Sequence, residues 1–187
     1  MLPSRPEEQA ASDHRPHRTR FRAVYDANYH HVLGYALRRT ATREDAEDVV
    51  AETFLTAWRR LERLPDGECA RPWLYGIARK VLANQRRGDV RRARLEGRVS
   101  GFAVQQPSNT ADEVAAVTAA FARLSDDDRE VLALTAWEEL DAGDIATVLG
   151  CSRNAARIRL HRARRRLAHE LEVGRDREWT VRRAETR

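Results

Sequence analysis

The sequence predicts an all-α fold, with two small helical domains joined by a flexible linker. Over most of the 187 residues, apolar side chains recur every three or four positions, which is the spacing of one helix face. Charged residues make up 34% of the chain and aromatic residues only 6%, which favours small helical bundles over one large core. Residues 89–111 contain Gly, Pro, Ser, Gln and Asn without a sustained apolar stripe, which indicates a linker.

The limits of the domains follow from these changes in pattern. Residues 1–19 are polar and contain three prolines, so we expect a flexible tail there. The first helical domain is expected over residues 20–88 and the second over residues 112–172. Residues 173–187 form a charged C-terminal tail to which the sequence assigns no function.

Several classes of function find no support in the sequence. Cys69 and Cys151 are far apart and lack metal-ligand spacing, so we expect reduced thiols in a cytoplasmic protein, with no metal and no cofactor. No apolar stretch is long enough to span a membrane, so we expect no membrane contact. The sequence has no Gly-rich phosphate loop and no nucleophile–base motif, which predicts that the protein is not an enzyme.

An acidic helix is predicted within the first domain. The Thr42 hydroxyl can cap its first turn, and Asp45 occupies the fourth position of a capping box. Helix-dipole complementarity explains part of the negative charge near its start. The rest indicates either a solvated face or a surface that binds a basic or polar partner helix. The acidic residues are Glu44, Asp45, Glu47, Asp48 and Glu52.

The next helix combines aromatic and basic side chains. Residues 64–71 form a loop, and Pro72 suits the first turn of the helix that follows. Trp73 and Tyr75 could stack on unpaired bases while the basic residues contact phosphates. The alternative is that both rings belong to the hydrophobic core.

A helix-turn-helix motif is predicted in the second domain. Asp141 can cap its first helix, Gly150 suits a turn that needs positive φ, and Ser152 can cap the second helix. Ala156, Leu160, Ala163 and Leu167 share the buried face of that second helix.

The outward side of this second helix is strongly basic. Residues 152–169 contain seven Arg and no acidic residue, and the whole chain has a net charge of +5. Such a helix fits a DNA major groove with phosphates on both sides, although a solvated basic face is the alternative. The residues expected on the outward side and its flank are Arg153, Asn154, Arg157, Ile158, His161, Arg162, Arg164 and Arg165.

Three segments in order resemble bacterial sigma-70 family sigma factors. Residues 45–58 (DAEDVVAETFLTAW) resemble the segment that binds core RNA polymerase, and residues 73–79 (WLYGIAR) resemble the promoter-melting segment. Residues 124–167, with DIA at 144–146 and LHRARRRL at 160–167, resemble region 4. Because only regions 2 and 4 and a short linker are present, the chain is similar to the extracytoplasmic-function (ECF, group IV) subgroup.

The resemblance implies a promoter-specificity factor that contacts the polymerase clamp helices and flap, promoter DNA and an anti-sigma factor. It implies that the residues binding core polymerase are Asp45, Glu47, Asp48, Glu52 and Phe54. The −10 element would be opened and held by the loop at residues 64–71 and by Arg71, Trp73, Tyr75, Arg79, Lys80, Asn84, Arg86 and Arg87. The −35 element would be read by Ser152, Arg153, Asn154, Arg157, Ile158, His161, Arg162 and Arg165.

The chain departs from the family pattern at a few of these positions. Ala155-Ala156 replaces a common Thr-Val pair, and Ile158 replaces a small polar residue and could contact a thymine methyl group. Lys80 and Asn84 stand where Asn and Asp are usual. Gly143 weakens its helix by about 1 kcal/mol relative to Ala. These differences bear on which promoter sequence the protein would recognise more than on its function as a sigma factor.

Two other functions remain open at this point. A stand-alone helix-turn-helix regulator would use the N-terminal bundle to bind an effector or to dimerise. A pure protein-interaction module would not contact DNA through its arginines. The regulator would bind duplex DNA tightly by itself and leave core polymerase unaffected.

Overall fold

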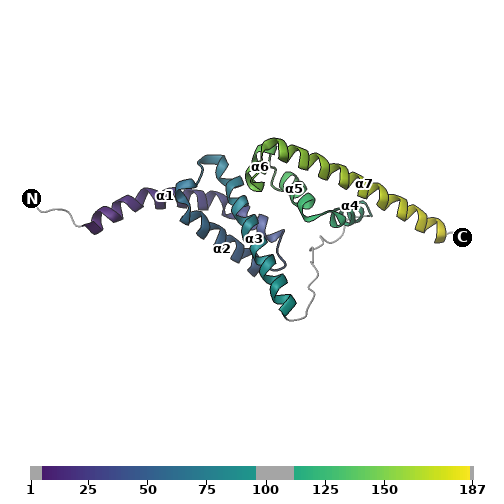
Figure 1. The fold of residues 1–187 in the computed structure, drawn as a ribbon, viewed down its shortest axis with the longest axis horizontal. Coiled ribbons are helices and arrows are strands. Elements are labelled where there is room, and N and C mark those ends of the chain that lie inside the picture. Colours follow the sequence, from purple (N-terminus) through teal and green to yellow (C-terminus); the bar gives the residue numbers. More distant parts are fainter. Residues whose placement is uncertain (1–5, 96–111, 186–187) are drawn as a thin grey trace, which may run out of the picture. The chain divides into compact units, whose positions relative to one another are not determined.

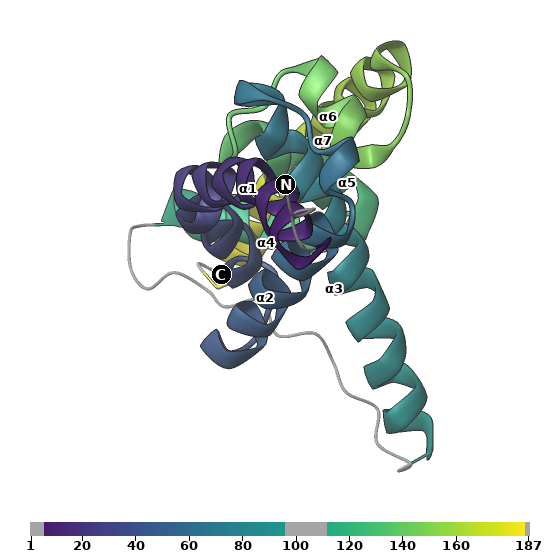
Figure 2. The same cartoon turned by 90° about the vertical axis from the view of Figure 1, so that its left-hand side faces the viewer.

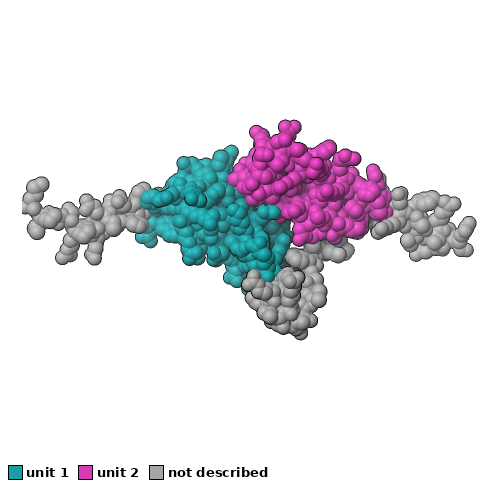
Figure 3. All heavy atoms as spheres, viewed as in Figure 1, with its two compact units in different colours: residues 1–101 teal, residues 102–187 magenta. Residues whose placement is uncertain are grey.

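The computed structural model describes residues 6–95 and 112–185, and the surroundings of side chains within residues 17–88 and 115–174. The described residues form α-helices and two short 3₁₀ helices, with no strand among them, so the all-α prediction is confirmed. The chain divides into two compact units, unit 1 (Met1–Gly101) and unit 2 (Phe102–Arg187) (Figure 3).

Unit 1 is a bundle of three helices. They are α1 (Pro6–Leu37), α2 (Arg43–Arg59) and α3 (Ala70–Leu95), and each packs against the other two (Figures 1 and 2). The connection between α2 and α3 contains the 3₁₀ helices η1 (Leu61–Arg63) and η2 (Gly67–Cys69). Periodic apolar side chains on each helix meet in a shared core because none of the three could bury its apolar face alone.

Helix α2 begins where the sequence predicts. The Thr42 hydroxyl oxygen accepts a hydrogen bond from the Asp45 backbone N–H at 3.1 Å and donates to the Asp45 carboxylate at 2.8 Å. This contact satisfies a backbone donor that the first helical turn leaves without an intrahelical partner. The same reciprocal arrangement recurs at the start of α5, where Ser125 and Asp128 take the two roles.

Unit 2 contains four helices. They are α4 (Asp112–Arg123), α5 (Asp126–Ala136), α6 (Ala142–Leu149) and α7 (Arg153–Glu185). Helices α4, α5 and α6 all pack on α7, which therefore organises the unit (Figure 1). Part of the core joins α4, α5 and α7 through Phe121, Leu124, Leu132, Leu160, Ala163 and Leu167.

Three helices extend beyond the limits expected from the sequence. Helix α1 begins at Pro6 within the predicted N-terminal tail, and α7 continues through Glu185 in the predicted C-terminal tail. Helix α3 runs to Leu95, into the predicted linker. Arg, Glu and Ala have favourable helix propensities, and adding a residue to an existing helix is far easier than starting a new one. Residues 96–111 of that linker lie outside the described residues.

Within the part of the chain that the structure describes, no helix is both long enough and apolar enough to cross a membrane.

Candidate functional site

The turn between α6 and α7 is closed by specific backbone contacts. The Asp141 Oδ1 atom accepts hydrogen bonds from the backbone N–H groups of Gly143 at 2.6 Å and Asp144 at 2.8 Å. Gly150 ends α6 with φ of 64°, a left-handed conformation that glycine adopts without a Cβ clash. The Ser152 hydroxyl oxygen then accepts from the Ala155 N–H at 3.2 Å. The three sequence-predicted positions of the helix-turn-helix motif are therefore confirmed.

An ion pair connects the first turns of α6 and α7. The Arg153 Nη2 atom lies 3.2 Å from Asp141 Oδ2, so one carboxylate both caps α6 and pairs with the first residue of α7. Hydrogen bonds from the Asp144 and Gly143 backbone lower the pKa of Asp141, and the positive charge of Arg153 adds to this effect. Asp141 is thus held ionised at the start of the motif.

Helix α7 has one buried face and one basic outward face. Ala156 and Ala163 are fully buried, and Leu160 and Leu167 are half-buried, as the sequence predicts. Ile158 is 43% exposed among the polar side chains of the outward face. All the residues that the sequence assigns to −35 DNA are exposed around the start and outward side of this helix: Ser152, Arg153, Asn154, Arg157, Ile158, His161, Arg162 and Arg165.

A second ion pair holds the middle of α7 against α5. The Arg166 Nη1 atom contacts both carboxylate oxygens of Asp128, at 2.8 and 2.6 Å, and the Ser125 hydroxyl donates to Asp128 at 2.7 Å. Burial alone would raise the pKa of Asp128, but the bonds from Ser125 and Arg166 outweigh it and lower the pKa. Nothing in the position of Asp128 along the sequence indicates a partner on α7.

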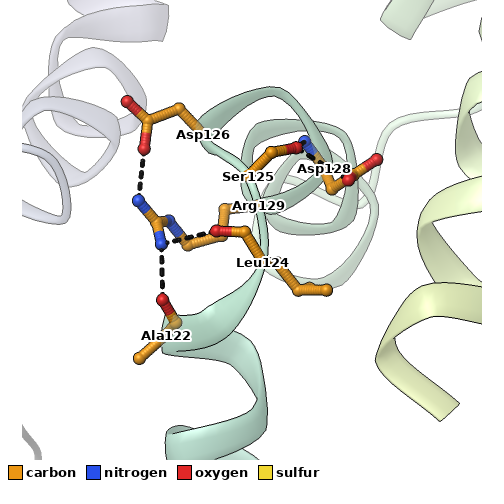
Figure 4. A network of polar contacts seen from close by, with 6 residues as sticks. All are labelled: Ala122, Leu124, Ser125, Asp126, Asp128 and Arg129. Atoms are coloured by element: carbon orange, nitrogen blue, oxygen red, sulfur yellow. Dashed lines mark hydrogen bonds and ion pairs between the residues drawn. The ribbon is translucent and has the colours of Figure 1, made fainter. Parts of the chain in front are cut away.

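Arg129 ties the end of α4 to the start of α5. Its Nη1 atom donates to the carbonyl oxygens of Ala122 and Leu124, both at 2.8 Å, and its guanidinium also pairs with Asp126 (Figure 4). These bonds satisfy carbonyl groups at a helix end that lack an intrahelical partner. Arg129 and the Asp128–Arg166 pair together fix the helices on which α7 rests.

The outward face of α2 is acidic with an apolar centre. Asp45, Glu47, Asp48 and Glu52 are exposed, as expected for a binding surface. Glu47 pairs with Arg43 at 2.8 Å, and Asp45 is engaged with Thr42.

Two exposed apolar residues on α2 were not anticipated from the sequence. Leu55 and Trp58 are 43% and 38% exposed. The helical repeat places Leu55 on the same face as the acidic residues and not on the buried face. This position in the repeat is the signal from which its exposure could have been predicted.

Phe54 does not belong to this outward surface. It is only 4% exposed, and its ring lies 4.6 Å from that of Tyr25 and 6.3 Å from that of Phe21 on α1. The expectation that Phe54 contacts core polymerase is therefore corrected: the ring packs α2 onto α1 and supports the acidic surface from below.

Tyr75 is also a core residue. It is 1% exposed, and its ring stacks on that of Tyr35 with centroids 4.8 Å apart. A ring in this position has no face available for a DNA base, so its assignment to −10 DNA is corrected. Trp73 is half-buried against the apolar cluster of Leu61, Leu64 and Ala70.

The polar residues expected at −10 DNA lie along α3 and at its start. Lys80, Asn84 and Arg87 are exposed, and Arg87 donates to the Asn84 side-chain oxygen. Arg71, Arg79 and Arg86 are half-buried, which leaves part of each side chain at the surface. The site on unit 1 is therefore cationic and amide-bearing, with less aromatic surface than the sequence suggested.

Family comparisons match both units. The family described as sigma-70 region 2 matches residues 24–92, and the family described as sigma-70, region 4, matches residues 115–167. These two segments contain the acidic face of α2, most of α3 and the helix-turn-helix motif.

Curated relatives extend the similarity over most of the chain. The ECF RNA polymerase sigma factor SigL of Mycobacterium tuberculosis is 35% identical over 158 residues, covering 81% of this chain and 88% of SigL. The RNA polymerase sigma factor YlaC of Bacillus subtilis is 30% identical over 169 residues, covering 87% of this chain and 98% of YlaC.

Solved structures show the same architecture. The sigma factor RpoE of Bartonella quintana, in complex with the anti-sigma factor NepR, superposes with a TM-score of 0.59 and 25% identity, over 83% of this chain and 96% of RpoE. CnrH, in complex with the cytosolic domain of CnrY, gives a TM-score of 0.56 and 27% identity, over 82% and 88% of the two chains. Together these similarities show that the chain belongs to the sigma-70 family of RNA polymerase sigma factors, among those of the ECF type.

Proposed function

We propose that this chain is a dissociable initiation subunit that gives core RNA polymerase its promoter specificity and helps to melt the −10 region. The acidic face of α2 docks on the polymerase clamp helices, and unit 2 contacts the flap. The loop after α2 and the polar side of α3 hold the opened −10 element, while α7 reads the −35 element in the major groove.

The observation that carries this proposal is the opposite charge of two exposed helix faces. The outward face of α2 carries Asp48 and Glu52 around exposed Leu55, which suits a basic or polar protein helix with an apolar side chain. The outward face of α7 carries Arg157, Arg162 and other cations and no carboxylate before Glu170, which suits a phosphate backbone.

The base-reading part of α7 is proposed from its exposure and chemistry. Asn154, His161 and the arginines supply hydrogen-bond donors for base edges and phosphates. Ile158 offers an apolar contact for a thymine methyl group, in place of the small polar residue common in the family. On unit 1, the proposed −10 surface comprises Arg71, Trp73, Arg79, Lys80, Asn84, Arg86 and Arg87.

Regulation by an anti-sigma factor is part of the proposal. Two sigma factors of similar structure, RpoE and CnrH, were solved in complexes, RpoE with an anti-sigma factor and CnrH with the cytosolic domain of CnrY. Because core polymerase is its principal partner, we place this chain in the cytoplasm. The domain limits that we propose are residues 20–88 for region 2 and residues 112–172 for region 4.

Reconstitution with core RNA polymerase tests the function. Transcripts that appear when the chain is overproduced identify candidate promoters from their aligned start sites, and a run-off assay on one of these promoters follows. We expect transcription only when both core polymerase and this chain are present. A chain that binds duplex DNA tightly by itself, fails to join core polymerase and leaves its transcription unchanged would instead be a helix-turn-helix regulator.

A further inference from the structure

The loop between α2 and α3 is anchored at both ends and exposed in the middle. Leu64 and Ala70 are almost completely buried, whereas Asp66, Gly67, Glu68 and Cys69 are exposed. Gly67 has φ of 58°, which turns the chain sharply at the tip. The apolar cluster beneath the loop consists of Leu61, Leu64 and Ala70, with Phe21 and Val24 of α1 and Trp73 of α3 packed against it.

The side chain of Arg20, on α1, forms hydrogen bonds with this loop. The Arg20 Nη2 atom donates to the Leu64 carbonyl oxygen at 2.5 Å and to Asp66 Oδ1 at 2.7 Å, and its Nε atom donates to the same Oδ1 at 3.0 Å. A planar guanidinium with several fixed donors can satisfy a backbone carbonyl and a carboxylate at once, which a lysine amine matches poorly. Arg20 therefore restrains the path of the loop backbone as well as the position of the Asp66 side chain.

The same contact adjusts the charge of the loop. Asp66 is highly exposed, with 87% of its side chain accessible, and a bare carboxylate there would repel the phosphates of an approaching DNA strand. Arg20 places a positive charge 2.7 Å from that carboxylate. An exposed ion pair contributes little to global stability, so its effect is expected mainly on the loop itself.

We infer that Arg20 is a positioning residue that holds the loop at residues 64–70 in the conformation that receives an unstacked base of the −10 element. This inference rests on the proposed function, since it assigns the loop to single-stranded promoter DNA. The match to the region 2 family begins at residue 24, and Arg20 lies before it. The inferred role therefore assigns part of the −10 base preference to a residue outside the matched segment.

Base selection by the polymerase complex tests this role. Core RNA polymerase loaded with the full chain is incubated with a pool of short single-stranded oligonucleotides of randomised sequence, and the bound fraction is sequenced. The wild-type complex should enrich particular bases at the −10 positions. Arg20→Ala should reduce the preference at one position about fivefold, the size of effect expected when one exposed ion pair is lost, while the other positions keep theirs.

Matched variants separate positioning from folding and from net charge. Arg22→Ala removes an exposed arginine on the same helix that pairs only weakly with Asp26, at 3.7 Å, so it should leave base selection unchanged. Asp66→Asn keeps the shape of the loop but weakens the ion pair and should lower preference at the same position by a smaller factor. Arg20→Lys should restore only part of the preference, because one amine cannot reproduce the three bonds.

The outcomes distinguish this inference from the function on which it rests. Two results would show that Arg20 does not position the loop. In one, the Arg20→Ala complex retains the wild-type base preference. In the other, Arg20→Ala weakens binding of the chain to polymerase and weakens binding of all oligonucleotides equally, whatever their base. In either case the wild-type complex still selects bases and the proposed function stands. If the wild-type complex selects no base at any position, the proposed function of the loop and the role of Arg20 both fail.

Discussion

Each unit has one helix with an exposed charged face, and the contacts that hold this helix on the rest of the unit differ between the two units. In unit 1, the acidic face of α2 rests on an aromatic core, in which Phe54 packs against rings of α1 and Tyr75 stacks on Tyr35. In unit 2, the basic helix α7 is fastened by ion pairs to the helices beneath it.

Three of the ion pairs that the structure describes in unit 2 join α4, α5 and the N-cap of α6 to α7. They are Arg153 with Asp141, Arg166 with Asp128 and Arg123 with Glu170. Within unit 2, residues of one chemical type serve both purposes: arginines fasten α7 to the helices beneath it and also cover its outward side.

The largest expected effect is on stability, and it separates substitutions at two neighbouring residues of α2. Phe54→Ala should lower the free energy of unfolding of unit 1 by about 3–5 kcal/mol, because it opens a cavity in the aromatic core. Leu55→Ala should leave stability almost unchanged and weaken binding to core polymerase about tenfold, as for an apolar anchor in an interface. Denaturant unfolding and a polymerase-binding titration on both variants check this. A Phe54→Ala protein that is as stable as wild type would show that the ring is not part of the core.

The side chains of α2, α3 and α7 show which features of the candidate site could be predicted from the sequence. Helical periodicity and charge correctly placed the exposed acids of α2 and the exposed arginines of α7, because a charged side chain is rarely buried without a partner. Aromatic residues were harder to place, since a ring is equally suited to a core and to base stacking. The family resemblance placed Phe54 on the polymerase-binding surface and Tyr75 at −10 DNA, whereas both rings are buried in the core of unit 1.

The ion pairs that hold the helices together could not be predicted from the sequence, for a different reason. The caps at Thr42, Asp141 and Ser152 are local and were predicted from spacing alone. The Asp128–Arg166 pair joins residues 38 positions apart and depends on how α5 packs on α7. The ends of α1 and α7 were also missed, because charged segments without an apolar stripe carry no signal that separates a continuing helix from a tail.

The next effect concerns the acid stability of unit 2. The pKa of Asp128 is lowered in the folded state, so its contribution is present at neutral pH and is lost as the pH falls from about 4, its unfolded value, through the folded pKa. Asp128→Asn should lower the free energy of unfolding at pH 7 by about 1–2 kcal/mol and make its dependence on acidic pH shallower. Thermal unfolding followed between pH 7 and pH 3 measures both. A variant with the same pH dependence as wild type would mean that Asp128 is not strongly coupled to Arg166.

A smaller effect is expected on the side of α7 that we propose binds DNA. Arg157→Ala and Arg162→Ala should each weaken promoter binding by the polymerase complex about three- to tenfold and lower the salt dependence by about one unit, because each removes one phosphate contact. Arg159→Ala is a matched control, since Arg159 is exposed on the same helix but lies on the flank shared with Arg166. Equal losses in all three variants would indicate a general effect of charge rather than an oriented face.

The smallest effect is expected at Gly143. A Cβ atom at this position would lie 3.1 Å from Asp141 Oδ1, which accepts two backbone hydrogen bonds, while Oδ2 of the same carboxylate pairs with Arg153. Gly143→Ala should therefore not give the stabilisation of about 1 kcal/mol that helix propensity alone predicts. A melting temperature that rises by several degrees would show that the Asp141 cap can move aside without cost.

A crossed binding measurement on two double variants tests the division between the two charged faces. One variant combines Asp48→Lys with Glu52→Lys on α2, and the other combines Arg157→Ala with Arg162→Ala on α7. Affinity for core polymerase is measured without DNA, and retention of duplex promoter DNA is measured with polymerase saturated by each variant. The α2 variant should lose polymerase affinity on the order of 100-fold, through like charges at the interface. The α7 variant should keep that affinity and lose the duplex. An α2 variant that binds polymerase like wild type, or an α7 variant that loses polymerase, would contradict the account.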